Sequence, residues 1–376
     1  MKASLYLFRQ WTAQVRQLLP DLHGHRTKTL AFFVFGLVLS GKARLPVMAE
    51  ELLAISSAKT PSIERRLQRF LANQQVAVVP IWTTFLAHVL RCFRERRLVF
   101  VLDTTPLDDR ACVVYLGLLV HSRLLPVGWR VMPLQEAWEE RQWAIVGTLL
   151  DRIILYVGAA DCTLIADSGL AGLPLVQLCQ SRQWHYLLRL SSQHTCQPQG
   201  GKRASRWLAM SELVSSPGQS WFGPALVWQA HHLAAFISAV WEPGYQDAWF
   251  LLSDQPAGRQ RVRAYAKRMR VESSFQDFKR RGWDIEATVI ADRARLDRLL
   301  LGLFLGVWWV SHLAAACIHQ GQRTRFDRHD RRDKGIFRLG RLWLHDLLRR
   351  DLQAASLAHC LPFHRQGATL VFALRF

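Results

Sequence analysis

The sequence has few acidic residues for its size and no close pair of cysteines. It contains 29 Asp+Glu against 49 Lys+Arg, which gives a net charge of +20. An enzyme for small neutral substrates needs no such excess, so the charge favours a polyanionic partner: nucleic acid first and an anionic membrane second. The seven cysteines are odd in number and form no CxxC motif. This pattern disfavours a disulfide framework or zinc site and favours free thiols in a reducing compartment.

Other familiar signals are also missing. No GxGxxG or GxxxxGK[ST] pattern occurs, so we expect no nucleotide cofactor. His194, His231 and His232 match no recognised spacing of metal ligands. No secretory signal is visible, and we expect a cytoplasmic protein. The run 299–318 is long enough to span a membrane, but Ser311 and His312 interrupt it, so a buried core helix is favoured and a membrane protein remains the alternative.

The first 96 residues show helical periodicity. Apolar positions recur at helical spacing in five segments: 5–19, 29–39, 46–55, 62–72 and 79–96. Thr60, followed by proline, marks a helix start, and Arg65, Arg66 and Arg69 follow on the polar side. This is typical of a small helical DNA-binding domain, which we place at 1–96. A solvated basic helix without DNA contacts explains the same pattern equally well.

From residue 98 onward, short apolar runs replace the helical pattern. Strands are predicted at 98–103, 110–120, 124–133, 163–167 and 185–190, and helices at 140–157 and 174–183. Three strands followed by helix, strand, helix and strand is, by analogy, the order of an RNase H-like (retroviral integrase-like) α/β domain. We assign 97–190 as the first part of this catalytic domain.

A segment rich in Gly, Pro, Ser and Trp then interrupts the domain. Strand-like pieces at 225–231, 234–241 and 248–252 indicate a β-rich insertion over 191–256. The second part of the catalytic domain is expected at 257–318, with helices over 265–279 and 292–318. The rest, 319–376, is expected to form a basic, largely helical C-terminal region for DNA contact or dimerisation, with a helix at 336–353. Between 259 and 350 there are 22 basic and 10 acidic residues, so this quarter of the chain holds more than half of the net charge.

Three carboxylates carry the chemical prediction. Asp103 and Asp167 each end a predicted buried strand, and Glu272 lies within the predicted helix 265–279. In an RNase H-like arrangement these three side chains converge, and converging acids repel one another unless divalent cations neutralise them. Oxygen ligands favour Mg²⁺, for which Mn²⁺ can substitute, and two such ions assist phosphoryl transfer. For any one acid taken alone, a structural role as a turn former or helix cap is the likelier interpretation.

The helix around Glu272 carries a second pattern. Tyr265, Arg268, Glu272 and Lys279 are spaced by 3, 4 and 7 residues, which places them on one helical stripe beside apolar positions. The motif Y-x2-R-x3-E-x6-K resembles the signature of the IS-four family of bacterial DDE transposases, often called YREK. The segments VLDTT at Asp103 and IADSG at Asp167, and the β insertion, are also similar to that family. A solvated helix face with i,i+4 ion pairs is the simpler alternative.

The resemblance implies specific roles. Asp103, Asp167 and Glu272 would be catalytic and hold two Mg²⁺ ions, while Tyr265, Arg268 and Lys279 would grip DNA phosphates. Family members with a β insertion cut DNA through a hairpin and flip a base onto an aromatic platform. Trp249, in DAWFLLSD, is the candidate platform, although one of 15 tryptophans in an apolar strand is more often core. Trp241 and Trp228 are the substitutes.

The expected function is therefore cut-and-paste transposition of an insertion sequence. The partners would be double-stranded DNA, both terminal inverted repeats and target, bound by a homodimer in a synaptic complex in the bacterial cytoplasm near the nucleoid. Two alternatives stay open: a catalytically inactive DNA-binding protein derived from a transposase, and an RNase H-like nuclease without strand transfer.

Overall fold

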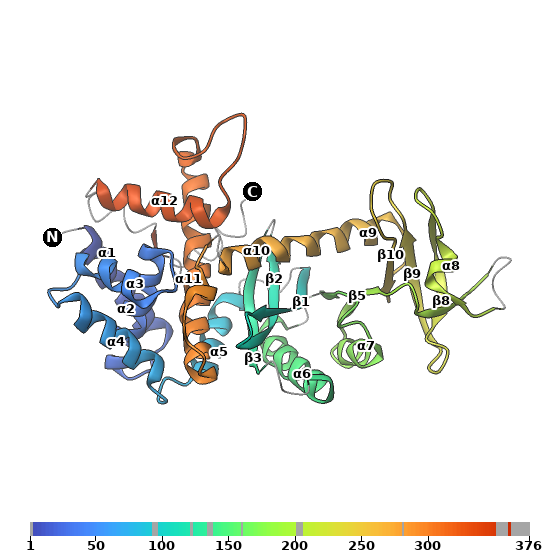
Figure 1. Cartoon of the computed structure of the whole chain (residues 1–376), viewed down its shortest axis with the longest axis horizontal. Coiled ribbons are helices and arrows are strands. Elements are labelled where there is room, and N and C mark those ends of the chain that lie inside the picture. The colour runs from blue at the N-terminus through green and yellow to red at the C-terminus, as the bar shows by residue number, and fades with distance from the viewer. Residues whose placement is uncertain are drawn as a thin grey trace.

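The computed structural model describes residues 3–91, 97–120, 123–133, 138–158, 161–200, 206–279, 282–350 and 360–361. Figure 1 shows an elongated molecule with helices at one end, a sheet in the middle and strands at the other end. The amino-terminal helices are α1 (Ala3–Leu18), α2 (Gly24–Ser40), α3 (Leu45–Glu51), the short 3₁₀ turn η1 (Leu52–Ala54), α4 (Thr60–Ala72) and α5 (Val78–Leu90). The five predicted helical segments are therefore confirmed, and the part of the last one beyond Arg91 lies outside the described residues.

A continuous mixed sheet forms the centre. Its first strands are β1 (Leu98–Leu107), β2 (Ala111–Val120) and β3 (Arg123–Met132), followed by α6 (Trp138–Val157), β4 (Cys162–Ala166), α7 (Leu173–Gln180) and β5 (His185–Leu190). β1 pairs antiparallel with β2 and parallel with β4, and β4 pairs parallel with β5. The predicted order of strands and helices is confirmed. One detail was wrong: β1 runs on for four residues past Asp103, because Thr104 to Leu107 keep pairing with β2.

The insertion extends this sheet. Its elements are β6 (Thr195–Pro198), β7 (Leu208–Ala209), α8 (Met210–Leu213), β8 (Ser220–Val227), β9 (Leu233–Val240) and β10 (Trp249–Ser253). The strand order is β3-β2-β1-β4-β5-β10-β9-β8-β6-β7. β10 pairs antiparallel with β5, so the β-rich segment joins the central sheet edge to edge. The predicted strand at 225–231 was placed too late, since β8 begins at Ser220 and the chain turns after Val227.

The segment that carries the motif is not one helix, as had been predicted for 265–279. It consists of α9 (Arg259–Ala266), a 3₁₀ turn η3 (Lys267–Met269) and α10 (Arg270–Phe278). The remaining elements are η4 (Ile285–Ala287), α11 (Arg293–His319), η5 (Gln322–Arg325) and α12 (Ile336–Arg349). α9 and α10 cross from the insertion toward α11 over the central strands (Figure 1).

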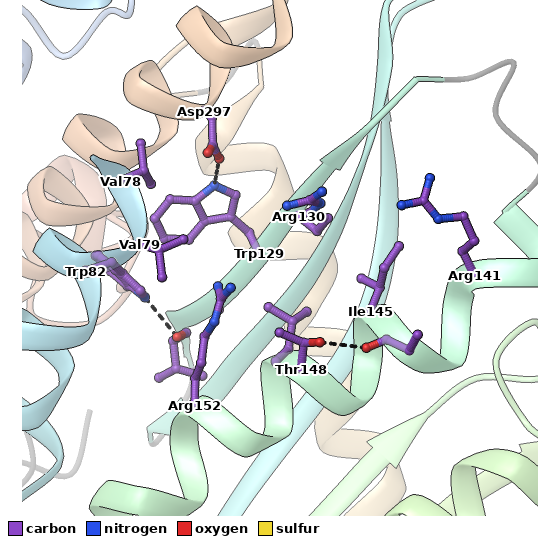
Figure 2. A pocket seen from close by; sticks show the side chains of 14 residues that line it. Val78, Val79, Trp82, Trp129, Arg130, Arg141, Ile145, Thr148, Arg152 and Asp297 are labelled. Atoms are coloured by element: carbon purple, nitrogen blue, oxygen red, sulfur yellow. Dashed lines mark hydrogen bonds between the residues drawn. The ribbon is translucent and has the colours of Figure 1, made fainter. Parts of the chain in front are cut away.

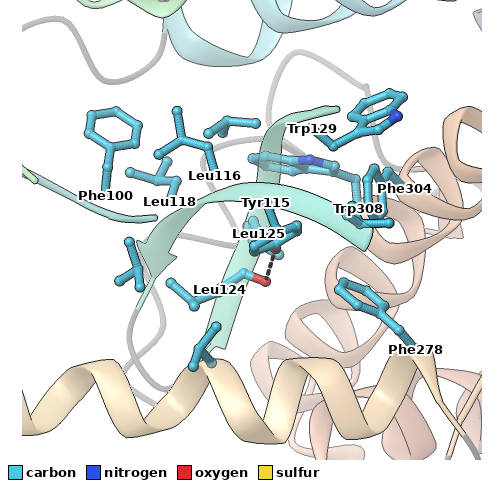
Figure 3. Packing of buried hydrophobic residues seen from close by; sticks show 14 of the residues in the cluster. Phe100, Tyr115, Leu116, Leu118, Leu124, Leu125, Trp129, Phe278, Phe304 and Trp308 are labelled. Carbon is cyan, nitrogen blue, oxygen red and sulfur yellow. Dashed lines mark hydrogen bonds between the residues drawn. The ribbon is translucent and has the colours of Figure 1, made fainter. Parts of the chain in front are cut away.

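Helix α11 is the central helix of the helical end of the molecule. It packs against α12, α2, α4, α5 and β3. By length and composition it could cross a bilayer, but 94% of its most apolar stretch is buried in protein, as a core helix requires. The aromatic rings of Tyr115, Phe278 and Phe304 meet with centroid distances of 5.4–5.8 Å (Figure 3). These rings fix the end of α10 between β2 and α11.

Strand β3 lies at one end of the strand order and is covered by helices. The indole N–H of Trp82, on α5, donates to the carbonyl of Val127 at 2.9 Å. The indole N–H of Trp308, on α11, donates to the carbonyl of Pro126 at the same distance. The pairing of β2 with β3 is irregular at this point. Two tryptophans thus satisfy main-chain acceptors that a regular ladder would have paired.

Candidate active site

Strand register places two of the predicted carboxylates next to each other. In the parallel pair β1–β4, Leu102 lies opposite Ala166. The next residue on each strand is an aspartate, Asp103 on β1 and Asp167 directly after β4. Parallel neighbouring strands are about 4.8 Å apart, so this register alone brings the two carboxylates within reach of a common partner.

That partner is the guanidinium of Arg268, on η3. Its Nη2 donates to Oδ2 of Asp103 and to Oδ2 of Asp167, each at 2.8 Å. The two oxygens therefore lie within twice that distance of each other. The contact is largely shielded from water, because the exposed fraction is 12% for the Arg268 side chain and 11% for that of Asp103. Asp167 is more open, at 34%.

Main-chain hydrogen bonds fix the other carboxylate oxygens. Oδ1 of Asp103 accepts the N–H of Thr104 at 2.8 Å, and Oδ1 of Asp167 accepts the N–H of Gly169 at 3.1 Å. Each aspartate thus turns one oxygen to its own backbone and the other to the shared cation. Asp167 begins a tight turn, since its carbonyl also accepts the N–H of Leu170 at 3.2 Å.

The electrostatic environment of Asp103 fits a cation-binding carboxylate. Burial raises its pKa, and the charges of Asp167 and Glu272 raise it further, whereas Arg268 and the Thr104 N–H lower it. The negative charge is thus only partly compensated by the one guanidinium present. More positive charge at this point would stabilise the ionised carboxylate.

Glu272 lies on the first turn of α10 and is exposed. It is near enough for its charge to raise the pKa of Asp103. Within the described residues, however, no three His, Cys, Asp or Glu side chains come close enough to form a metal site. The structure therefore gathers the two aspartates and leaves Glu272 beside them. The apolar residues flanking the motif behave as predicted: Val271 and Phe278 are buried and Phe275 is half-buried.

The other two motif residues, Tyr265 and Lys279, have different surroundings. Tyr265 is buried, with 1% exposed, and its hydroxyl has no hydrogen-bond partner among the described residues. Burial raises the pKa of this phenol to about 12. Lys279 follows the end of α10 and pairs with Glu286 at 3.4 Å, so it does not contact the aspartate pair. The four motif residues lie on successive elements: Tyr265 on α9, Arg268 on η3, Glu272 on α10 and Lys279 directly after α10.

Trp249 begins β10 and packs edge-on against Tyr265, with ring centroids 5.2 Å apart. It lines a cavity of about 170 Å³ together with Tyr245, Glu242, Asp247 and Arg263. Among the described lining residues two are acidic and one is basic, and Glu242 is also paired with Arg259. Trp241, one of the two substitutes, has its indole N–H bonded to the carbonyl of Tyr245 at 2.9 Å.

The three amino-terminal arginines divide into two kinds. Arg65 and Arg69 are exposed on α4. Arg66 instead lies over the ring of Phe32, with 4.2 Å from its guanidinium carbon to the ring centroid, and burial lowers its pKa. Arg66 therefore has a packing partner within the protein, whereas Arg65 and Arg69 face solvent.

A second basic feature lies on the sheet edge, away from the aspartates. A cavity of about 260 Å³ opens between α5, β3, α6 and α11, with Arg130 and Arg152 beside Asp297 (Figure 2). Asp297 accepts the indole N–H of Trp129 at 2.6 Å. Burial raises the pKa of Asp297, and the nearby arginines lower it. Among the described lining residues Asp297 is the one acid, and it compensates part of the charge of the arginines there.

One residue near the site was missed by the sequence analysis. Arg110, in the turn between β1 and β2, donates to the carbonyls of Thr288, Ile290 and Glu286 and pairs with Asp108 at 2.7 Å. It thereby ties the strand that carries Asp103 to the loop after α10. Asp108 takes a left-handed backbone with φ of 52°. Nothing in the local sequence indicates these long-range partners.

Part of the chain is similar to a known protein family. Residues 142–309 match the family model described as a transposase DDE domain. The matched stretch includes Asp167, Arg268 and Glu272 and begins after Asp103. No curated protein matches the chain. The family match, the mixed α/β sheet and the paired aspartates together support a DDE transposase, a class of DNA-processing enzyme.

Proposed function

We propose that the protein is a cut-and-paste transposase of the IS-four type, built on an RNase H-like catalytic domain with a β-rich insertion. The observation that carries the proposal is the strand register that sets Asp103 beside Asp167, with a cation between them. The family match supports the broader part of the proposal, a DDE transposase. Its natural substrates would be the terminal inverted repeats of an insertion sequence and a target duplex.

The site residues fit divalent magnesium. Two convergent carboxylates, one of them buried and incompletely neutralised, offer the hard oxygen donors that Mg²⁺ and Mn²⁺ prefer. Asp103 and Asp167 would hold the ions, and Glu272 would join them when DNA is bound. The ions would supply Lewis-acid activation of the attacking oxygen and stabilisation of the leaving oxygen.

The chain's own groups would position DNA at this point. Arg268 Nε and the Tyr265 hydroxyl are buried and have no hydrogen-bond partner within the described residues, and a phosphate next to the scissile bond could engage them. Lys279 would reach such a phosphate only by leaving Glu286. Trp249 and its cavity would receive a base displaced from the duplex, because aromatic faces stack on bases of any sequence.

Each chemical step would be an in-line attack of an oxygen on phosphorus at the same site. Water would nick one strand, the freed 3′-hydroxyl would form a hairpin with the opposite strand, and water would reopen it. The 3′-hydroxyl would then join target DNA. Two ends must be processed together, so a homodimer on DNA is expected, with Arg65 and Arg69 and the basic carboxy-terminal part holding the duplex.

The decisive experiment incubates the purified protein with linear duplexes that carry the sequences bracketing its gene, with and without Mg²⁺. Denaturing gels should show a nicked strand, then a hairpin of twice the strand length, and joined products when target DNA is added. A nuclease would give nicks without hairpins or joined products. A binding-only protein would shift the duplex and leave it uncut, which would refute the proposal.

A further inference from the structure

Arg268 occupies the space between the two aspartates that a divalent cation would need. Its Nη2 lies 2.8 Å from one oxygen of each carboxylate. We propose that Arg268 is a built-in counter-ion that keeps the aspartate pair closed to divalent metal until DNA draws the guanidinium away. The inference deepens the proposed function and rests on it.

The Arg268 guanidinium and a divalent metal ion would compete for the same two carboxylate oxygens, both for space and as positive charges. A cation bridging the same two oxygens would lie close to Nη2, and two positive charges at such a short separation repel each other, so metal entry is opposed while Nη2 stays in place. The guanidinium is 12% exposed and Asp103 is nearly buried, so the attraction is little weakened by water. Two close carboxylates without any cation would repel each other strongly in this environment. The arginine therefore stabilises the metal-free site and opposes metal entry at once.

The bonding of Arg268 shows that it can be drawn away. One terminal nitrogen makes both carboxylate bonds, while Nε is buried and finds no hydrogen-bond partner in the part of the chain that the structure describes. An arginine with an unused buried donor gains a bond when it meets an acceptor that can receive two N–H groups side by side. A DNA phosphate is such an acceptor, and Arg–phosphate pairs are frequently bidentate. A phosphate could thus accept the Nε–H of Arg268, which the aspartates leave without a hydrogen bond.

The basic residues around Arg268 should attract DNA phosphates to it. The segment from Arg259 to Arg270 contains six Lys or Arg residues and no acid. Arg268 lies on the 3₁₀ turn η3, where α9 ends and α10 begins, and its neighbours Lys267 and Met269 are exposed. A duplex attracted by this basic segment would lie beside the turn. Its phosphates would then compete directly with the carboxylates for the guanidinium.

The expected consequence is that DNA and metal bind with positive coupling. DNA should raise the affinity of the aspartates for divalent metal, and metal should raise the affinity for DNA by the same factor. The protein would carry few catalytic ions in the absence of DNA. Metal-dependent cleavage would then be restricted to protein already seated on a duplex.

Binding of Mn²⁺, followed through the electron paramagnetic resonance signal of the free ion, tests this directly. Wild-type protein, Arg268→Gln and the matched control Lys267→Gln would be titrated without DNA. Lys267 is one residue away and exposed, and its removal deletes the same charge without touching the aspartates. We expect Arg268→Gln to bind Mn²⁺ about tenfold more tightly or better, since a charge-assisted contact is removed, and Lys267→Gln to change by less than about threefold.

The second arm adds a short duplex, with Asp103→Asn as the background for ions bound to DNA or elsewhere. DNA should tighten Mn²⁺ binding by the wild-type protein and have a much smaller effect on Arg268→Gln, whose site is already open. Equal Mn²⁺ affinities for wild type and Arg268→Gln without DNA would overturn the inference. Failure of every variant to bind Mn²⁺ above the Asp103→Asn background, with DNA present, would instead refute the metal site on which the proposed function rests.

Discussion

The two strand-borne acids and the helix-borne acid are held in different ways. Asp103 and Asp167 each receive a main-chain N–H and a shared guanidinium, and the register of β1 with β4 fixes their spacing. Glu272 stands exposed on α10, a nine-residue helix preceded by a 3₁₀ turn, and forms no hydrogen bond or ion pair within the described part of the chain. The sheet thus fixes the positions of the two aspartates, whereas the position of Glu272 depends on how the short helix α10 packs.

Because the three acids are held differently, we expect the two aspartates to contribute to stability as well as to catalysis, and Glu272 to contribute to catalysis. The aspartates belong to the folded framework and interact with a buried cation even without substrate. Glu272 forms no hydrogen bond or ion pair with the described residues, so its replacement should affect chemistry more than folding. The seating of α10 rests on a few contacts with β3 and on the ring cluster around Tyr115. Each prediction below tests one side of this comparison.

The largest effect is expected in DNA cleavage. Asp103→Asn, Asp167→Asn and Glu272→Gln should each lower the rate of strand nicking by at least about a hundredfold, because loss even of outer-shell partners costs metal sites ten- to a hundredfold. Asp151→Asn is the matched control: Asp151 lies in the same sheet-and-helix unit but pairs with Arg182 on the surface. Gel assays with Mg²⁺ measure the rates. Near-wild-type nicking by Glu272→Gln would remove the third acid from the site.

The next effect concerns stability without metal. Arg268→Gln leaves two close carboxylates without a cation and should lower the free energy of unfolding by about 2 kcal/mol at neutral pH in EDTA. Glu272→Gln should change it by less than about 0.5 kcal/mol, as expected for an exposed side chain. Urea denaturation measures both, and added Mg²⁺ should restore much of the loss in Arg268→Gln. Equal stability losses in the two variants would contradict the distinction between framework and mobile acid.

The pH dependence of the free energy of unfolding should report how α10 is packed against β3. Asp277, near the end of this helix, is paired with Arg123 of β3 at 3.0 Å, yet burial raises its pKa to about 6. The folded protein then holds the proton more tightly than the unfolded chain. Stability should therefore fall as pH rises from about 4 to about 6, by on the order of 2 kcal/mol from this group. In Asp277→Asn this part of the pH dependence should vanish, as urea denaturation across that range would show.

The smallest effect comes from a single hydrogen bond. The hydroxyl of Ser274 on α10 accepts the buried N–H of Leu124 on β3 at 3.2 Å. Ser274→Ala should lower the free energy of unfolding by about 1 kcal/mol, because that N–H loses its acceptor. Ser273→Ala, one residue away and without a hydrogen bond within the described residues, should be close to neutral. A loss of equal size in both variants would show that helix propensity, and not docking to β3, sets the effect.

Much of the framework follows from local sequence. Runs such as LVFVLD and TLIAD are apolar enough to be buried strands, and they place Asp103 and Asp167 at adjacent positions once β1 and β4 pair in parallel. The amphipathic spacing around Val271 and Phe278 likewise gives the buried face of α10. These features depend on short-range pattern, which a sequence displays directly.

The missed features depend on partners far along the chain. A continuous helix over 265–279 satisfied the local pattern, but a 3₁₀ turn interrupts it at η3, and there Arg268 bonds to residues 165 and 101 positions away. The motif assigned Arg268 to a phosphate, and no local signal indicated that the aspartates would hold it first. Arg66 looked like its neighbours Arg65 and Arg69, and only the position of the Phe32 ring separates them. Charged side chains choose partners by three-dimensional proximity, which spacing does not encode.

The tryptophan-capped strand β3 limits how two copies could associate. With Val127 and Pro126 already accepting indole N–H groups, and with helices lying along it, this border of the sheet is a poor template for recruiting a strand from a second molecule. Fusion of two sheets into one through β3 is thereby disfavoured. A pair of subunits brought together by two DNA ends would have to meet through helices, through the insertion or through the nucleic acid itself.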